Sequence, residues 1–241
     1  MRLLTCGLVA ASGLFAGQSE ENSAFQALIR TFLNDLSRNN IGVDNPEIQD
    51  YVGRIAQKLS TDCNFGASVT VHILFNEEAN LSSLPGWHLI VHTGFLQHVR
   101  SEAALAGALT QILFQSISFR PEERKTLWLG SPYLLYESRF PGTAGSLRAR
   151  ILEADRRAAT CLFAAGYDAA ELPEDLRLQS VSGDFHAERI RRLEAQIQGL
   201  SRTSPALILT SSFLEMQYRL AALLRPIHPT TLRANRQQSP E

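Results

Sequence analysis

The sequence has almost no net charge and contains no long apolar segment. Its 23 basic and 24 acidic residues leave a formal net charge of -1, a balance that does not favour nucleic acid as a partner. No apolar run reaches the roughly 18 residues that a membrane-spanning helix needs. The longest interior candidate, Leu127 to Tyr136, is broken by Gly130 and Pro132. We therefore expect no nucleic-acid partner and no membrane span.

The chain also lacks the short motifs of several large enzyme classes. It contains no Gly-x-Ser-x-Gly elbow, no phosphate loop and no Gly-x-Gly-x-x-Gly, so serine hydrolase and nucleotide chemistry are not indicated. Its composition is otherwise ordinary for a globular protein, with 241 residues, 44% of them hydrophobic and 20% charged. This length is sufficient for one domain with a sizeable core.

Charge is also missing from the N-terminal segment. Met1-Arg2 precedes Leu3–Ala16, which is uncharged and mostly small or apolar, and polar residues follow at once. This pattern predicts a signal peptide over residues 1–17, and hence an exported, periplasmic or secreted protein. Cleavage near Ala11-Ser12-Gly13 and near Ala16-Gly17 are both compatible with the pattern. The alternative is an N-terminal core helix.

Cysteine is scarce, with three residues in the whole chain. Cys6 falls within the predicted signal peptide, which leaves Cys63 and Cys161 in the mature protein. We expect these two to be separately buried thiols. A disulfide between them is the alternative, because an exported protein meets an oxidising environment.

The hydrophobic pattern predicts a mostly helical α+β domain over residues 18–224 with one small sheet. Apolar spacings of three and four indicate helices over 25–36, from 46 onward, and over 101–119, 147–165, 185–197 and 212–224. Alternation indicates strands over 69–75 and 87–91, with a further short strand at 207–209. The helix that begins at Pro46 should bury a stripe of Ile48, Tyr51, Val52, Ile55 and Leu59. The polar tail, 225–241, is expected to be disordered.

Several short motifs occur in a specific linear order. Asn80-Leu81-Ser82-Ser83-Leu84-Pro85-Gly86-Trp87 is followed by Val91-His92-Thr93-Gly94-Phe95-Leu96 and then by Ser101-Glu102-Ala103-Ala104-Leu105. Glu153-Ala154-Asp155 and Ala165-Gly166-Tyr167-Asp168 come later. This series, from about Asn45 to Ile190, resembles the metallopeptidase family of the CAAX prenyl protease and HtpX, peptidase family M-48. The resemblance implies a zincin-like (gluzincin) α+β fold.

The family's chemistry requires His-Glu-x-x-His on the helix that begins near Ser101. Two His residues four apart on one helix face bind zinc, and the Glu activates the bound water. In this chain the corresponding positions are Gln111, Ile112 and Gln115. An amide is a poor zinc ligand and Ile112 cannot transfer a proton. The resemblance thus implies zinc, but the residues that would hold it are absent.

The family's third ligand, a Glu on a later helix, corresponds to Ile151 in this sequence. Asp155, which the resemblance places beside the metal ligands, is retained. We expect Asp155 to make local hydrogen bonds, and the former zinc site to be a largely apolar helix contact bridged by Gln amides. His88 and His92 cannot share a metal, because residues four apart in a strand are separated by about 13 Å. His186 receives no role.

The leading hypothesis is therefore a catalytically inactive metallopeptidase homologue that binds a polypeptide or protein partner through the remnant cleft. An active zinc-dependent metalloendopeptidase is the alternative. Pairing with a peptide needs only the backbone of an edge strand. We predict that this edge is formed by Pro85, Gly86, Trp87, His88, Leu89, Ile90 and Val91. Trp87 and Trp128 are candidate contacts, with burial in the core as the alternative for either.

Overall fold

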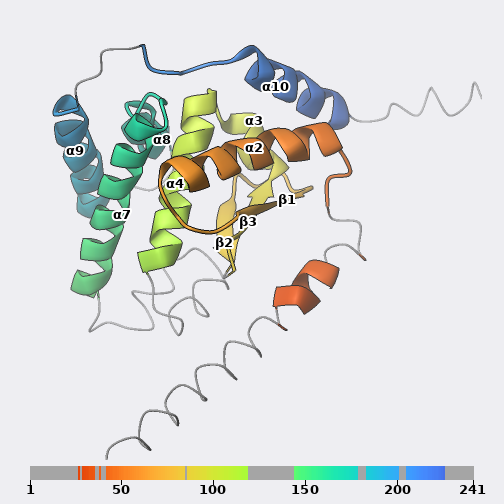
Figure 1. Ribbon diagram of the computed structural model, residues 1–241, viewed down its shortest axis with the longest axis horizontal. Coiled ribbons are helices and arrows are strands. Elements are labelled where there is room, and N and C mark those ends of the chain that lie inside the picture. Colours follow the sequence, from red (N-terminus) through yellow and green to blue (C-terminus); the bar gives the residue numbers. More distant parts are fainter. Residues whose placement is uncertain are drawn as a thin grey trace, which may run out of the picture.

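The computed structural model confirms a mostly helical α+β fold with one small sheet (Figure 1). It describes residues 27, 29–35, 38, 42–84, 86–118, 144–178, 183–200 and 205–225. The predicted signal peptide lies outside these residues, as does the predicted tail apart from Arg225. The elements, in chain order, are α2 (Pro46–Asp62), β1 (Thr70–Leu74), β2 (Leu81–Leu84), β3 (His88–His92), α3 (Thr93–His98), α4 (Glu102–Ser118), α7 (Ala144–Ala164), α8 (Glu171–Leu178), α9 (Asp184–Gln198) and α10 (Ser211–Leu223).

The three strands are arranged in the order β1-β3-β2, with β3 parallel to β1 and antiparallel to β2. Leu89 on β3 is opposite Val71 on one side and Ser83 on the other. The prediction that residues 85–91 form the edge strand is therefore wrong. The chain turns back after β2 so that the hairpin places Leu81–Leu84 outside β3. Pro85 lies outside the described residues.

The turn between β2 and β3 places Gly86 and Trp87 in left-handed backbone conformations, with φ of 87° and 67°. Such a conformation suits tight hairpins and costs a residue with a side chain roughly 1 kcal/mol or more. The half-buried Trp87 ring packs against Phe65, with ring centroids 5.6 Å apart. Packing of Trp87 against the core agrees with the alternative given for it above, and Trp128 lies outside the described residues.

Helix α2 begins where the sequence predicted. The Asn45 side chain accepts a hydrogen bond from the Ile48 amide at 3.1 Å, and Pro46 occupies the first turn, where its missing N–H costs nothing. The predicted stripe is buried in full, and the helix packs against β1 and α4. The members of that stripe are Ile48, Tyr51, Val52, Ile55 and Leu59.

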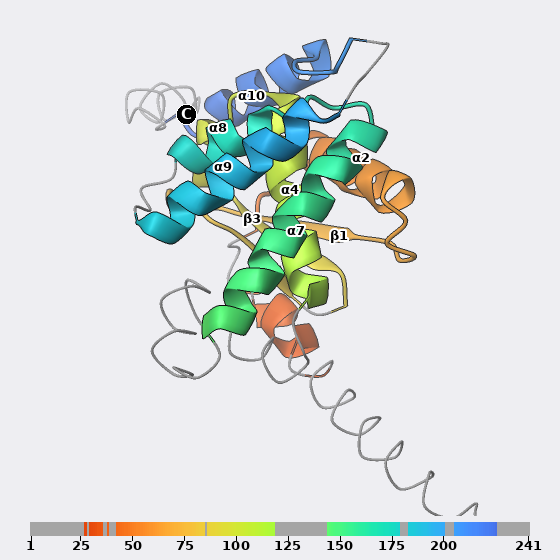
Figure 2. The same ribbon diagram turned by 90° about the vertical axis from the view of Figure 1, so that its left-hand side faces the viewer.

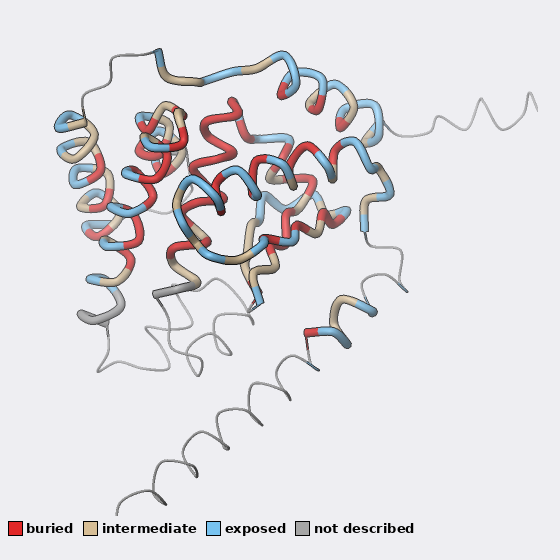
Figure 3. The backbone as a smooth tube through the Cα atoms, in the orientation of Figure 1, coloured by how far each residue is buried: buried red, intermediate tan, exposed pale blue. Residues whose placement is uncertain are grey.

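Helix α4 lies at the centre of the molecule and is buried along most of its length (Figure 3). The Ser101 hydroxyl accepts a hydrogen bond from the Ala104 amide at 3.0 Å, as expected of a cap. At the same end the buried Glu102 carboxylate accepts hydrogen bonds from Tyr51 at 2.7 Å, from Tyr167 at 3.2 Å and from Thr210. Burial and the adjacent carboxylate raise the pKa of both tyrosines. These bonds fix α4 to the elements around it.

The later helices also follow the pattern of the sequence. Helix α7 ends at Ala164, close to Gly166, whose φ of 89° suits a residue without a side chain. The predicted strand at 207–209 is wrong as a strand, because only a single bridge joins Leu207 to Tyr167. In the part of the chain described, no helix is both long and apolar enough to span a bilayer.

A disulfide joins Cys63, at the end of α2, to Cys161 on α7, with Cα atoms 5.1 Å apart. The expectation of two separate thiols is therefore wrong. The two residues are separated by 98 positions in the sequence, so their proximity depends on how α2 packs beside α7. This tertiary contact brings the two sulfur atoms together.

We predict that reduction of the disulfide lowers the free energy of unfolding by about 4 to 5 kcal/mol, because a long cross-linked loop restricts the unfolded chain. Urea unfolding followed by circular dichroism, with and without dithiothreitol, measures the difference. The Cys63→Ser/Cys161→Ser variant serves as the control and should not respond to reductant. Coincident curves for the oxidised and reduced wild-type protein would contradict the prediction.

Candidate functional site

The four positions that the resemblance aligns with the zinc ligands and the catalytic base lie on two neighbouring helices. Gln111, Ile112 and Gln115 are on α4 and Ile151 is on α7. The two helices run antiparallel along each other, and α7 lies between α4 and α9 (Figures 1 and 2). Gln111 and Gln115 are one helical turn apart and share a face. Gln111 reaches α7 through a side-chain hydrogen bond.

A buried amide–carboxylate hydrogen bond joins α4 to α7 at this contact. The Gln111 side chain is 6% exposed, and its Nε2 donates to Oδ1 of Asp155 at 2.6 Å. Asp155 is 2% exposed. Burial of a carboxylate is costly unless its oxygens accept hydrogen bonds. The expected bridging by Gln amides is confirmed at Gln111, and the expected hydrogen-bonding role of Asp155 is confirmed.

Arg189 on α9 completes the coordination of the same carboxylate. Its Nε donates to Oδ2 of Asp155 at 2.7 Å and its terminal nitrogen donates to Oδ1 at 3.0 Å. This two-point geometry gives strong, charge-assisted bonds. The pairing of Arg189 with Asp155 was not predicted from the sequence, although a buried Asp predicts a nearby cation. Gln111, Asp155 and Arg189 are called the carboxylate junction below.

The remaining replaced positions make the contact apolar only in part. Ile151 is buried at 5% exposure, and Ile112 is half-buried against the core. Gln115 is also half-buried. The expectation of a largely apolar contact is therefore correct at Ile151 but wrong at Asp155, where a buried ion pair occupies the interface. The retained Asp needed a partner, and Arg189 supplies it.

The donor set at this contact does not fit the zinc ion that the resemblance implies. Gln111 uses its amide nitrogen, which cannot bind a cation, to satisfy Asp155. The side chains of Ile112 and Ile151 carry no metal-binding atom, and both oxygens of Asp155 already accept hydrogen bonds. Among the described residues, no group of three or more His, Cys, Asp or Glu side chains is placed to hold a metal. The arrangement is suited to holding helices together.

In the described part of the chain, the strand β2 presents an unpaired edge beside α4. The His92 amide donates to the Asn80 carbonyl at 3.1 Å, which fixes the alternation of the antiparallel ladder. Leu81 and Ser83 consequently direct their backbone N–H and C=O groups away from β3. Helix α4 contacts β2 directly. Within the described residues, β2 is paired on one side only.

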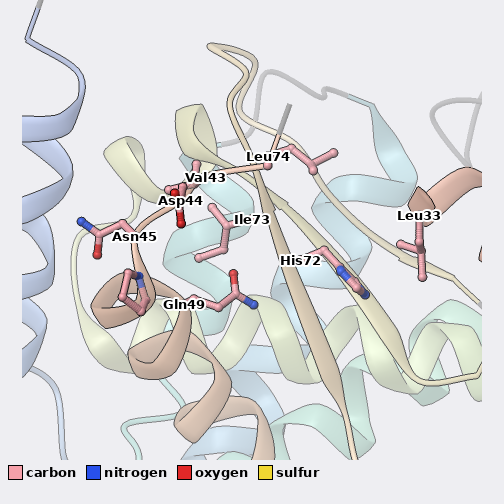
Figure 4. A pocket seen from close by; sticks show the side chains of 10 residues that line it. Leu33, Val43, Asp44, Asn45, Gln49, His72, Ile73 and Leu74 are labelled. Atoms are coloured by element: carbon pink, nitrogen blue, oxygen red, sulfur yellow. The ribbon is translucent and has the colours of Figure 1, made fainter. Parts of the chain in front are cut away.

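The opposite edge of the sheet is already covered. The Val43 amide donates to the Ile73 carbonyl at 2.9 Å, and the Gln49 side chain donates to the Val71 carbonyl. A pocket of about 330 Å³ lies here, lined by Gln49, His72 and Asp44 among others (Figure 4). It is separate from the α4–α7 contact. An extended peptide can therefore pair more readily with the outer edge of β2 than with the outer edge of β1.

His186, which was assigned no role from the sequence, contacts a neighbouring helix. The His186 ring on α9 lies with Nε2 2.8 Å from the Leu176 carbonyl on α8. The ring nitrogen therefore donates to a helix-terminal carbonyl and joins two helices. This position agrees with the absence of any assigned role.

The Arg189→Met substitution tests the carboxylate junction. We predict that it destabilises the protein by about 3 to 5 kcal/mol, because it leaves a buried carboxylate without its cation. Chemical unfolding of the variant gives the value. Adding Asp155→Leu should recover part of the loss, since the uncompensated charge is then removed. Equal stability of Arg189→Met and wild type would show that the ion pair contributes nothing.

The sequence was also compared with known proteins. No protein-family model matches the chain, and no curated protein sequence matches it. The resemblance to the metallopeptidases therefore depends on the motifs of the sequence. Two residues that those motifs single out, Gln111 and Asp155, are joined by a hydrogen bond.

Proposed function

We propose that the protein is a non-catalytic relative of the M-48 zinc metallopeptidases, with a zincin-like fold, which binds an extended polypeptide. The observation that carries the proposal is the edge of β2 next to α4, which no strand among the described residues pairs. An extended peptide can add a strand to such an edge through main-chain hydrogen bonds alone. Binding then requires neither a metal nor a catalytic base.

The retained framework around the replaced positions supports the family assignment. The Thr93-Gly94 turn is held by hydrogen bonds between Thr93 and the Asn76 backbone, at 2.9 and 3.1 Å. A side chain at Gly94 would lie 2.1 Å from the Glu77 carbonyl oxygen, so the position requires glycine. Ser101 and Glu102 act as cap and anchor of α4. Motif residues thus have local structural duties that do not depend on zinc.

An exported location is part of the same proposal. A disulfide between Cys63 and Cys161 forms and persists in an oxidising compartment, whereas cytosolic reductants keep thiols reduced. The predicted signal peptide, 1–17, points in the same direction. Extended polypeptides of other exported proteins are the ligands that such a location would supply.

Restoring the family's ligands tests the assignment. We predict that the Gln111→His/Ile112→Glu/Gln115→His/Ile151→Glu variant binds one zinc per chain, because its donors would then meet where α4 and α7 are in contact. Metal analysis after gel filtration, and Co²⁺ absorption spectra, measure the uptake. The variant that retains Ile151 is the matched control and should bind more weakly. A folded variant that takes up no metal would overturn the assignment.

Proline and alanine at Ser83 test the binding edge. Ser83→Pro removes an outward N–H and adds ring atoms at the free edge, while the ladder to β3 keeps its hydrogen bonds. We predict that Ser83→Pro binds fluorescein-labelled, unfolded β-casein about tenfold more weakly. This change in affinity corresponds to the loss of one to two hydrogen bonds. Ser83→Ala keeps the backbone donor and should bind as wild type does. Fluorescence anisotropy gives the affinities.

Mass spectrometry of the same casein reports whether it is cut. Intact casein bound more weakly by Ser83→Pro than by Ser83→Ala supports the proposal. Equal affinity of both variants would place the binding surface elsewhere. Zinc-dependent cleavage that a chelator abolishes would establish the alternative, an active metalloendopeptidase.

A further inference from the structure

Two histidines meet on the face of the sheet that turns away from α4. In the parallel ladder His72 on β1 is opposite Ile90, and His88 on β3 is opposite Thr70. These register positions place the two imidazoles on the same face, on neighbouring strands. Nε2 of His72 lies 3.0 Å from Nδ1 of His88, and both rings are half-buried. From the sequence, His88 was considered together with His92. Its partner in the structure is His72, which is 16 residues away.

We propose that His72 and His88 form a chelating site for a divalent copper ion, with water or other small ligands in its remaining positions. The two nitrogens already face each other, and both strands are fixed by the ladder. Without metal, one ring donates its N–H to the other ring. A bound ion would replace that shared proton and accept a lone pair from each nitrogen.

The order of affinities among the divalent first-row metals favours copper over zinc. The 3.0 Å between the two nitrogens is the length of a hydrogen bond, so each ring must turn for its lone pair to point to an ion. Square-planar and tetragonal nitrogen sites are typical of Cu²⁺, which also binds most tightly among the divalent first-row metals.

Protons compete only weakly with a metal ion for the nitrogen lone pairs of His72 and His88. Burial lowers the pKa of both imidazoles below the ordinary value, and the neighbouring His88 lowers that of His72 further. At neutral pH both rings are therefore neutral, and each can offer a nitrogen lone pair. In the described residues around the sheet, no third side chain of metal-binding type joins the two rings. The site is accordingly an exchangeable one, open to solvent ligands.

The pair is separate from the surface proposed for peptide binding. Val71, Leu89 and Val91 belong to the core that includes α4. Leu74, Leu84 and Ile90 point to the other face, where they pack with Ile29 and neighbouring apolar residues. His72 and His88 alternate with the first set and so lie on this second face. Copper binding and peptide binding can therefore be tested independently.

Titration of the tag-free full chain with Cu²⁺, buffered by glycine as a competing chelator, tests the site. We expect one tight equivalent, and electron paramagnetic resonance of that complex should show coupling to two imidazole nitrogens. His72→Asn and His88→Asn should each weaken binding by roughly 100-fold, because the second ring binds as an intramolecular ligand. Circular dichroism checks that each variant is folded.

His92→Asn is the matched control. His92 lies on the same strand as His88 and its pKa is also lowered by burial, but it is four residues further along. Its substitution should leave the copper affinity unchanged. Affinity that is equal in all three variants, a wild-type spectrum without two imidazole nitrogens, or tighter binding of Zn²⁺ than of Cu²⁺ would each overturn the proposal.

Discussion

The arrangement of the helices depends on one buried carboxylate. Asp155 lies where α4, α7 and α9 meet, and it cannot be buried without donors for its oxygens. Gln111 supplies one donor from α4 and Arg189 supplies two from α9. Three segments distant in sequence are thereby fixed in register with one another. This constraint is part of the antiparallel contact of α4 with α7.

A second buried carboxylate anchors the other end of the central helix. Glu102, at the start of α4, accepts hydrogen bonds from Tyr51, Tyr167 and Thr210. Together the two carboxylates bind α4 to α2, to the segment after α7 and to the segment before α10. Hydrogen bonds thus join α4 to α7 at one point and to the elements around its first turn at another.

Gln111 supplies a buried donor to Asp155. At this position the proposed relationship to the M-48 peptidases would place a His that Asp155 orients. The Gln111 amide donates to this carboxylate, so Asp155 is not left unsatisfied. Ile151 is apolar and buried. Under the proposed relationship, the carboxylate junction would occupy the place of a metal centre.

The sequence predicted those features that depend on neighbours along the chain. The Asn45 cap, the buried stripe of α2, the Ser101 cap and the end of α7 near Gly166 all involve residues a few positions apart. Their periodicity and capping chemistry are visible in one dimension.

The features that the sequence could not predict all depend on packing between distant segments. The order of the strands is one, because Ser82 and Ser83 gave little sign that they form an outer strand. The partnership of Arg189 with Asp155 is another, since it crosses 34 residues. The meeting of His72 with His88 requires a parallel register. Neither the strand order nor these two contacts produces a periodic pattern in the sequence.

The disulfide has a topological consequence. Residues 63 to 161 form a covalent ring that contains the whole sheet, α3 and α4. A single cut anywhere inside this ring, including the long stretch between α4 and α7, leaves both pieces attached to each other. A protease that nicks the chain there would convert one polypeptide into two without dividing the molecule. That closure preserves the molecule after damage to its backbone.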